Sequence, residues 1–285
     1  MYYFLKSLAY SLSLLSQRGV ERFAYGLSVF CFDIIRIRRQ VTVSNLQIAF
    51  KDSLSQKDIV KLGRRSFYHF TLTFLELFRS QKHNISSDIE IKGGEHLEKA
   101  LAKGQGVYSL CFHMGNWEAM CSKMSRTYVD SHVIVKKVGS DKVNRFVEEL
   151  RTHNDFHWIR RRKGRKGDAL LQMRRILANK EIIGFAIDQA RPGEPRLPFF
   201  GKPAKTNTSF AAIWFRHPAP IIPGFIRRVS AGKHILEFLP EFEMIDTGDK
   251  EADIIANSIA FNKMVESVVR QYPEQYFWMH NRWKL

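Results

Sequence analysis

Residues 107–118 read VYSLCFHMGNWE, an apolar run that turns polar at its end. The run from Val107 to Phe112 predicts a buried strand, and residues 115–126 predict a helix. In one continuous helix, His113 and Glu118 would be five residues and about 140° apart around the axis, unable to pair. Because glycine tolerates sharp bends, we expect Gly115 to separate the strand from the helix.

The alternation of strands and helices continues on both sides of this stretch. Short apolar runs predict further strands at 89–92, 131–137, 181–188, 220–228 and 233–239. Longer periodic segments predict helices at 95–102, 141–152, 167–179, 206–215 and 250–271, with a Pro-rich connection over 191–203. Such alternation builds a mainly parallel central sheet with flanking helices. We therefore predict an α/β fold.

The N-terminal part has a helical pattern of its own. A long helix is expected from Ser55, with Asp58 as a loose capping box, to Phe78. Before it, leucines recur at helical spacing, which suits an interfacial helix or a buried packing helix; they are Leu5, Leu8, Leu12 and Leu15. We predict a membrane-associating helical region over 1–82 and an α/β domain over 83–285.

Charge points to an anionic partner. Lys and Arg number 45 against 28 acidic residues, which gives a net charge of +17 and a pI near 9.9. Nucleic acid and acidic lipid would both attract such a protein. The apolar run 23–32 is shorter than the about 20 residues of a membrane span. The basic cluster Arg36, Arg38 and Arg39 follows it, as expected on a cytoplasmic membrane face.

His113 and Glu118 are the candidate catalytic residues. A bend between them would place His113 just before the helix and Glu118 in its first turn, at a strand end where ligands collect. Glu118 could then hold one imidazole nitrogen, leaving the other to take a proton from an alcohol, with His113 as general base. For an isolated His-x4-Glu, the ordinary explanation is a histidine at a helix start beside an incidental glutamate.

Two rival chemistries have weaker sequence support. Cys111 lies two residues before His113, but a cysteine in an apolar strand is usually inert core. His153 and His157 have the spacing of a helical metal pair, yet no third ligand follows in a metalloenzyme pattern. The three cysteines form no Cys-x-x-Cys pair, which argues against a disulfide framework and for a reducing compartment. The sequence therefore predicts no metal and no cofactor.

The block from His113 to Glu118 resembles the active-site motif of the lipid A biosynthesis acyltransferases, the late acyltransferases of lauroyl or myristoyl type. Further similar blocks follow in the same order over about residues 90–285. They are Arg151 after a polar helix, Asp188-Gln189 at a strand end, Pro198-Phe199-Phe200-Gly201 with Thr206, and Pro273-Glu274-Gln275-Tyr276 through Trp278, His280, Arg282, Trp283 and Lys284.

This resemblance implies a glycerolipid-acyltransferase-like core and transfer of a fatty acyl group, usually from acyl carrier protein, to a hydroxyl of an anionic lipid A precursor. It implies a reaction at the cytoplasmic face of a bacterial inner membrane. His113 and Glu118 would be catalytic, without a metal or a covalent acyl-enzyme. The same resemblance implies that the substrate-binding residues are Asn116, Arg151, Asp188 and Gln189.

Two stretches depart from the family pattern. Lys136-Lys137-Val138 stands where relatives often have Arg-Pro, so phosphate recognition there is altered or supplied elsewhere. The run from Arg160 to Lys166 is more basic than usual. It suits the phosphates of lipid A, the acidic surface of acyl carrier protein, or a solvated loop.

Other functions stay open at this point. The same His113 chemistry could acylate a lysophospholipid or a glycolipid. A non-catalytic basic protein that binds membranes or nucleic acid is a more distant alternative, and the sequence contains no recognition motif for nucleic acid. The sequence does not choose the acylated hydroxyl, the acyl chain length, or acyl carrier protein over coenzyme A as donor.

Overall fold

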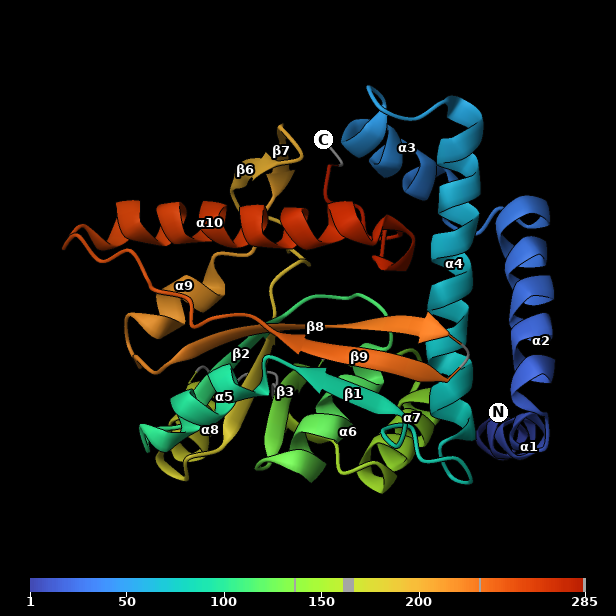
Figure 1. The fold of residues 1–285 in the computed structure, drawn as a ribbon, viewed down its shortest axis with the longest axis horizontal. Helices are drawn as coiled ribbons and strands as arrows, with labels where there is room; N and C mark the ends of the chain where they lie inside the picture. Colours follow the sequence, from blue (N-terminus) through green and yellow to red (C-terminus); the bar gives the residue numbers. More distant parts are fainter. Residues whose placement is uncertain (136, 161–166, 231, 284–285) are drawn as a thin grey trace.

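A seven-stranded sheet forms the centre of the protein, in the order β1-β9-β8-β2-β5-β3-β4 (Figure 1). The structure, a computed structural model, describes residues 1–135, 137–160, 167–230 and 232–283. The strands are β1 (Ile89–Lys92), β2 (Val107–Cys111), β3 (Ser131–Val135), β4 (His157–Arg160), β5 (Ile182–Ala186), β8 (Ile221–Ser230) and β9 (Lys233–Phe238). Every pairing except β8 with β9 is parallel. The predicted α/β class is confirmed.

Helices cover both faces of this sheet, because its central strands are apolar on both sides. They are α5 (Gly94–Ala102), α6 (Trp117–Thr127), α7 (Asp141–His153), α8 (Asp168–Ala178), α9 (Ser209–Trp214) and α10 (Lys250–Gln271). Val107 and Ile182 face a cluster that includes side chains of α5 and α6. Their neighbours Tyr108 and Ile183 point to the opposite face, into the larger core that includes side chains of α8, α9 and α10.

The chain before the sheet is helical, as predicted. Its elements are α1 (Tyr2–Ser13), α2 (Gln17–Val29), the π-helical turn η1 (Phe30–Ile34), α3 (Arg39–Phe50) and α4 (Gln56–Arg79). The Ser55 hydroxyl accepts a hydrogen bond from the Asp58 N–H at 3.2 Å, which confirms the predicted start of the long helix. In Figure 1, α4 stands across one end of the sheet, with α2 on its outer side.

Leu5, Leu8 and Leu12 of the predicted leucine stripe form a packing face of α1, whereas Leu15 lies beyond this helix and is exposed. Leu12 is buried in one cluster with Leu72 and Leu75 of α4. The other side of α1 exposes Tyr3 and Phe4. No helix within the described part of the chain has both the length and the apolar character that crossing a membrane requires. The predicted division at residue 82 stays a prediction.

The sequence-based prediction missed two pieces of β structure. The edge strand β4 is only four residues long and follows α7 closely, so the segment between two helices was predicted without a strand. The Pro-rich connection contains a hairpin of β6 (Arg196–Phe199) and β7 (Lys202–Lys205). The two-residue turn of this hairpin, Phe200-Gly201, has positive φ at both positions, as a tight hairpin turn requires. The hairpin was not predicted because the prolines of this connection argue against strands.

Candidate active site

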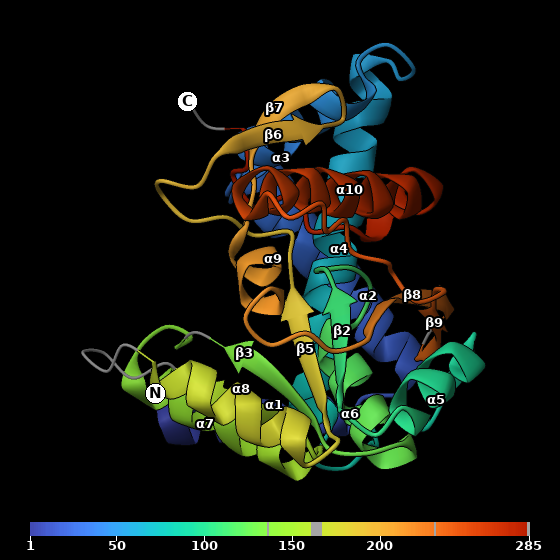
Figure 2. The same ribbon diagram turned by 90° about the vertical axis from the view of Figure 1, so that its left-hand side faces the viewer.

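The candidate residues lie at the carboxyl end of the parallel strands, where the arrowheads of β2 and β5 point in Figure 2. The strands β2 and β5 are paired in register up to Cys111 and Ala186. Two residues further along each strand, His113 and Asp188 therefore lie opposite one another. Asp188 and Gln189, which follow β5, both contact the His113 ring and therefore lie at the same sheet edge as His113.

The predicted bend at Gly115 is present. Gly115 has a φ of +56°, and a Cβ atom there would lie 2.2 Å from the carbonyl oxygen of Ile226. Only glycine fits both the left-handed conformation and this close approach. The chain then turns into α6, which starts at Trp117 after its N-cap Asn116. His113 thus precedes the helix and Glu118 lies in its first turn, as expected.

The hydrogen bonds of His113 differ from the sequence-based prediction. Its Nδ1 lies 2.8 Å from Oδ1 of Asp188, and its backbone N–H donates to Oδ2 of the same carboxylate at 3.0 Å. Asp188, not Glu118, therefore holds the imidazole. A carboxylate at this position favours the Nδ1–H tautomer and puts the lone pair on Nε2, which lies 3.3 Å from the side-chain nitrogen of Gln189. The His113 side chain is 23% exposed, so a substrate can reach it.

The carboxylate of Glu118 instead binds Arg151 of α7. Two hydrogen bonds join them, from Nε to Oε2 at 2.9 Å and from Nη2 to Oε1 at 2.7 Å. Glu118 pairs with Arg151 because a planar guanidinium can donate two hydrogen bonds to one carboxylate. His113 pairs with Asp188 because the register of β2 and β5 places these two residues opposite one another. The predicted residues Glu118 and Arg151 are thus together, as a largely buried ion pair.

These charges control the protonation of His113. Burial lowers the pKa of His113, but the charge and hydrogen bond of Asp188 outweigh it and raise this pKa above its usual value. Glu118 raises it further and Arg151 lowers it. The pair of Glu118 and Arg151 is therefore close enough to act electrostatically on the imidazole.

The helix α4 supports the bend from behind. Thr73 donates a hydrogen bond to the carbonyl of Gly115 at 2.8 Å. The Asn116 amide donates to Glu76 at 2.6 Å, while its oxygen accepts from the N–H of Ala119. Asn116 was predicted to bind substrate, but these contacts with protein groups use both ends of its buried amide.

Glu76 in turn binds Arg228 of β8, at 2.6 Å between Oε2 and Nη2. Burial raises the pKa of Glu76, but Arg228 outweighs this effect and holds it below its usual value, so Glu76 is ionised. Burial, together with Arg228, lowers the pKa of His69 to about 3, which keeps that ring neutral. The sequence analysis missed this network. A lone glutamate inside the apolar segment 74–78 was the available signal.

The C-terminal segment closes the site from the other side. The N–H of Phe277 donates to the carbonyl of His113 at 3.0 Å, and the N–H of Gly115 donates to that of Gln275 at 3.1 Å. The side chain of Ser66 in α4 donates to the Tyr276 carbonyl. Segments separated by some 160 residues in the sequence therefore form one structure around His113. Of the basic residues in the sequence blocks, Lys136, Lys284 and the run 161–166 lie outside the described residues.

The surroundings of Cys111 disfavour its thiolate form. Burial and the nearby charge of Asp188 raise the pKa of its thiol to about 12, so the reactive thiolate is absent near neutral pH. This agrees with the prediction that Cys111 is not a nucleophile.

An apolar cavity of about 400 Å³ lies beside the site. Its walls are Ile37, Arg38, Phe67, Phe70, Phe277, Met279, His280 and Asn281. None of the predicted site residues lines it, but the Phe277 ring lies 6.0 Å from that of His113 and stacks on Phe70. Another wall residue, Ile37, is 45% exposed and follows η1. The cavity therefore extends from beside His113 towards the N-terminal surface.

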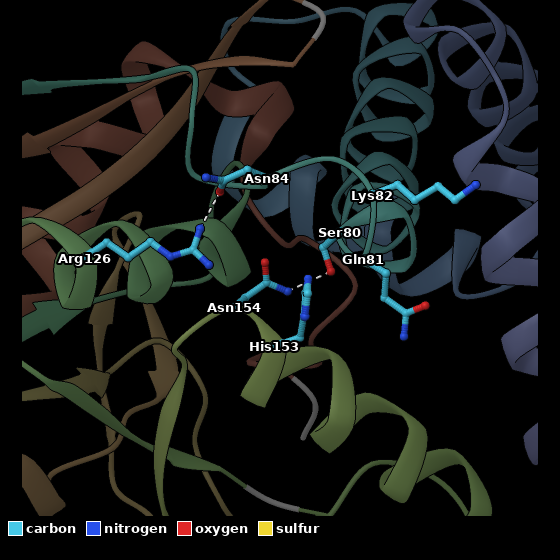
Figure 3. A pocket seen from close by; sticks show the side chains of 7 residues that line it. All are labelled: Ser80, Gln81, Lys82, Asn84, Arg126, His153 and Asn154. Atoms are coloured by element: carbon cyan, nitrogen blue, oxygen red, sulfur yellow. Dashed lines mark hydrogen bonds between the residues drawn. The ribbon is translucent and has the colours of Figure 1, made fainter.

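A second cavity of about 320 Å³ is polar and lies elsewhere (Figure 3). It is formed where α4, α6 and α7 end, so it lies at the opposite end of the sheet from His113. Arg126 and Asn154 each hydrogen-bond a neighbouring wall residue, Asn84 and Ser80, across it. None of the predicted site residues belongs to it.

Asp188→Asn is expected to move the pH dependence of the reaction. A general base works only when unprotonated, so activity rises with pH through the pKa of His113. Because the Asp188 carboxylate raises this pKa, its removal should shift the acidic limb of the kcat/KM profile to lower pH. We also expect kcat to fall by up to about 10⁴, as for the equivalent change in a catalytic triad. The exposed Asp246→Asn variant is the control and should keep the wild-type pH profile. If the acidic limb of the kcat/KM profile stayed at the wild-type pH in Asp188→Asn, this role of Asp188 would be contradicted.

The comparisons with known proteins agree with these features. A family model described as bacterial lipid A biosynthesis acyltransferase matches residues 2–285. The chain is similar to lipid A biosynthesis palmitoleoyltransferase of Escherichia coli (strain K12), at 22% identity over 272 residues, covering 88% of this chain and 80% of that protein. The same values hold for lipid A biosynthesis acyltransferase of Shigella flexneri.

Proposed function

Because the chain belongs to the bacterial lipid A biosynthesis acyltransferase family, we propose that it moves a fatty acyl chain from an acyl carrier protein thioester to a hydroxyl of a lipid A precursor. The observation that carries the mechanism is the His113 imidazole, which Asp188 holds through Nδ1 beside an apolar cavity. A base that accepts a proton through Nε2 and a neighbouring apolar cavity suit a hydroxyl acceptor and an acyl donor.

The proposed reaction needs no covalent enzyme intermediate. Nε2 of His113 takes the proton of the acceptor hydroxyl, whose oxygen bonds to the thioester carbonyl carbon. The carbonyl oxygen becomes an oxyanion in the tetrahedral intermediate. The C–S bond then breaks, the carbonyl re-forms, and the imidazolium returns the proton to the leaving thiolate. The products are an ester and a free thiol.

Arg151 is the proposed stabiliser of the oxyanion. Its positive charge lies near enough to lower the pKa of His113, and Glu118 fixes its guanidinium through two hydrogen bonds. The amino end of α6 is the positive end of the helix dipole and also favours negative charge near His113. Glu118 is then a positioning residue that acts through Arg151. One lost oxyanion donor costs about 10²–10³ in kcat.

The proposed location is the membrane surface, with the N-terminal helices as the contact. Large exposed apolar side chains gather in the first 37 residues, where they are Met1, Tyr3, Phe4, Tyr10, Leu14, Leu15, Phe23, Tyr25, Phe30, Ile34, Ile35 and Ile37. Beyond these, the exposed large apolar residues of the described chain are Leu171, Val229 and Ile245. Such a concentration is typical of an interaction surface. The exposed basic residues Arg36 and Arg38 beside it favour anionic lipid.

The apolar cavity is the proposed site of the acyl chain. A thioester at His113 would place its chain past Phe277 and towards Ile37, an exposed residue of the cavity wall. Ile37→Trp is therefore expected to reduce transfer of longer chains relative to shorter ones. A CH₂ group contributes about 0.8 kcal/mol when buried, so excluding two of them should change relative kcat/KM about tenfold.

Competition between lauroyl, myristoyl and palmitoleoyl thioesters measures this effect. Ile34→Trp is the matched control, because Ile34 is also an exposed isoleucine, three residues before Ile37, but does not line the cavity. An unchanged preference in Ile37→Trp would place the acyl chain elsewhere.

Mass spectrometry of lipid A from cells that lack the gene tests the proposed acceptor. We expect loss of one secondary acyl chain, restored by the wild-type gene and not by His113→Ala. Intact lipid A together with an altered phospholipid or glycolipid pattern would instead identify one of those lipids as the acceptor.

A further inference from the structure

We propose that the protein binds one Zn²⁺ ion at the amino ends of β3, β4 and β5, through Asp130, His132, His157 and Glu181. This site is at the end of the sheet opposite His113. It adds a metal to a chain whose sequence pattern predicted none. His153 and His157, whose spacing in the sequence is that of a helical metal pair, do not lie on one helix, because His153 ends α7 and His157 begins β4.

The strand register brings the four side chains to one face of the sheet. His132 and His157 are direct partners in the parallel pair of β3 and β4. Ser131 pairs with Ile182, so the residues just before them, Asp130 and Glu181, also lie side by side. Side chains two residues apart on a strand share a face, and so do partners in register. Four residues of ligand type, from three adjacent strands, are therefore directed to the same place.

The ligand atoms are already close together. Nε2 of His132 lies 2.7 Å from Oε2 of Glu181, and Nε2 of His157 lies 3.5 Å from Oδ1 of Asp130. One donor atom each of Asp130, His132 and Glu181 lie within 4.8 Å of one another. In a tetrahedral zinc site with bonds of about 2.0–2.1 Å, ligand atoms are about 3.3 Å apart. Small side-chain movements would bring the atoms of Asp130, His132 and Glu181 to that spacing. His157 lies outside this group of three and contacts it through Asp130, so its ring would have to move towards the ion as the fourth ligand.

The chemistry of the set favours zinc. Two neutral imidazoles and two carboxylates offer the nitrogen and oxygen ligands that Zn²⁺ takes, and the two negative charges balance the ion. The side chains of His132 and Glu181 are 17% and 23% exposed, so these ligands are held by surrounding structure. Four protein ligands leave no open position for a substrate, which is typical of a structural zinc. The ion would join three strands and stabilise the sheet.

The test uses the full-length, untagged protein in detergent, treated with chelator and then titrated with ZnCl₂ alone. We expect one Zn²⁺ per chain by calorimetry and a Tm that rises with zinc concentration. His132→Ala and His157→Ala should weaken binding at least about tenfold, the smallest loss that even outer-shell changes usually cause. They should also remove the rise in Tm. His96→Ala, a half-buried histidine of α5, is the matched control and should bind as the wild type does.

Two results would overturn the proposal. One is a wild-type protein that binds no zinc at micromolar concentration or whose Tm does not respond. The other is equal zinc affinity in the His132→Ala, His157→Ala and wild-type proteins. If His132→Ala does not fold, zinc binding by His157→Ala and Asp130→Asn tests the proposal instead. These two substitutions are at the surface, where the side chains are 39% and 56% exposed, so the variants should fold. Acyl transfer does not enter these readouts, so they are independent of the proposed reaction.

Discussion

His113→Ala is expected to lower acyl transfer by about 10²–10⁴-fold, the usual contribution of a positioned general base. Substrate binding should change little, because the cavity beside the site is formed by other residues. The loss should therefore appear in kcat and not in KM. The measurement is steady-state transfer by purified protein from an acyl carrier protein thioester.

The control separates loss of the base from loss of the fold. His113 contributes its backbone N–H and carbonyl to hydrogen bonds that an alanine can also make, with Asp188 and Phe277. The variant should consequently unfold near the wild-type temperature. His96→Ala controls for the loss of a half-buried histidine elsewhere. Wild-type kcat in His113→Ala would remove His113 from the mechanism.

Glu76→Ala is expected to destabilise the protein by about 3–5 kcal/mol, because it leaves Arg228 charged and buried without its partner. Arg228 is 7% exposed, and Glu76 accepts two hydrogen bonds from its guanidinium. The same substitution removes the acceptor of the Asn116 amide. Activity should therefore fall before the protein unfolds, as the bend at Gly115 loses support.

Thermal unfolding in detergent measures this effect, with Glu95→Ala, an exposed glutamate of α5, as control. A double variant, Glu76→Leu with Arg228→Met, separates the cost of an unpaired charge from the value of the pair. Replacing both partners by apolar residues is often neutral or stabilising, so the double variant should be more stable than Glu76→Ala. A Glu76→Ala protein as stable as the wild type would show that Arg228 does not depend on Glu76 and that its contact with His69, 3.0 Å from Nη1 to Nδ1, is sufficient.

The local part of the site could be predicted from the sequence. The step from β2 through Gly115 to α6 depends on an apolar run, a glycine and a helix start within twelve residues, and each signal is local. The start of α4 at Ser55 is equally local, because the capping hydroxyl and its acceptor N–H are three residues apart. Such features depend on neighbours in the chain.

The partners of the catalytic candidates could not be predicted in the same way. The spacing of His113 and Glu118 indicates that they can approach, but not which partner each prefers. That choice depends on the pairing of β2 with β5, which places Asp188 opposite His113, and on α7, which supplies Arg151. The support from Glu76 and Thr73 arises because α4 crosses the end of the sheet, a packing that no local pattern specifies.

In the proposed reaction, His113 activates a lipid A hydroxyl for attack on a protein-bound acyl thioester. Incubation of the purified wild-type protein with an acyl carrier protein thioester and a lipid A precursor, followed by mass spectrometry, tests this reaction directly. We expect a precursor heavier by one acyl chain, an equal amount of free carrier thiol, and neither product with His113→Ala. Acylation of a lysophospholipid but not of the lipid A precursor, or equal product from His113→Ala, would contradict it.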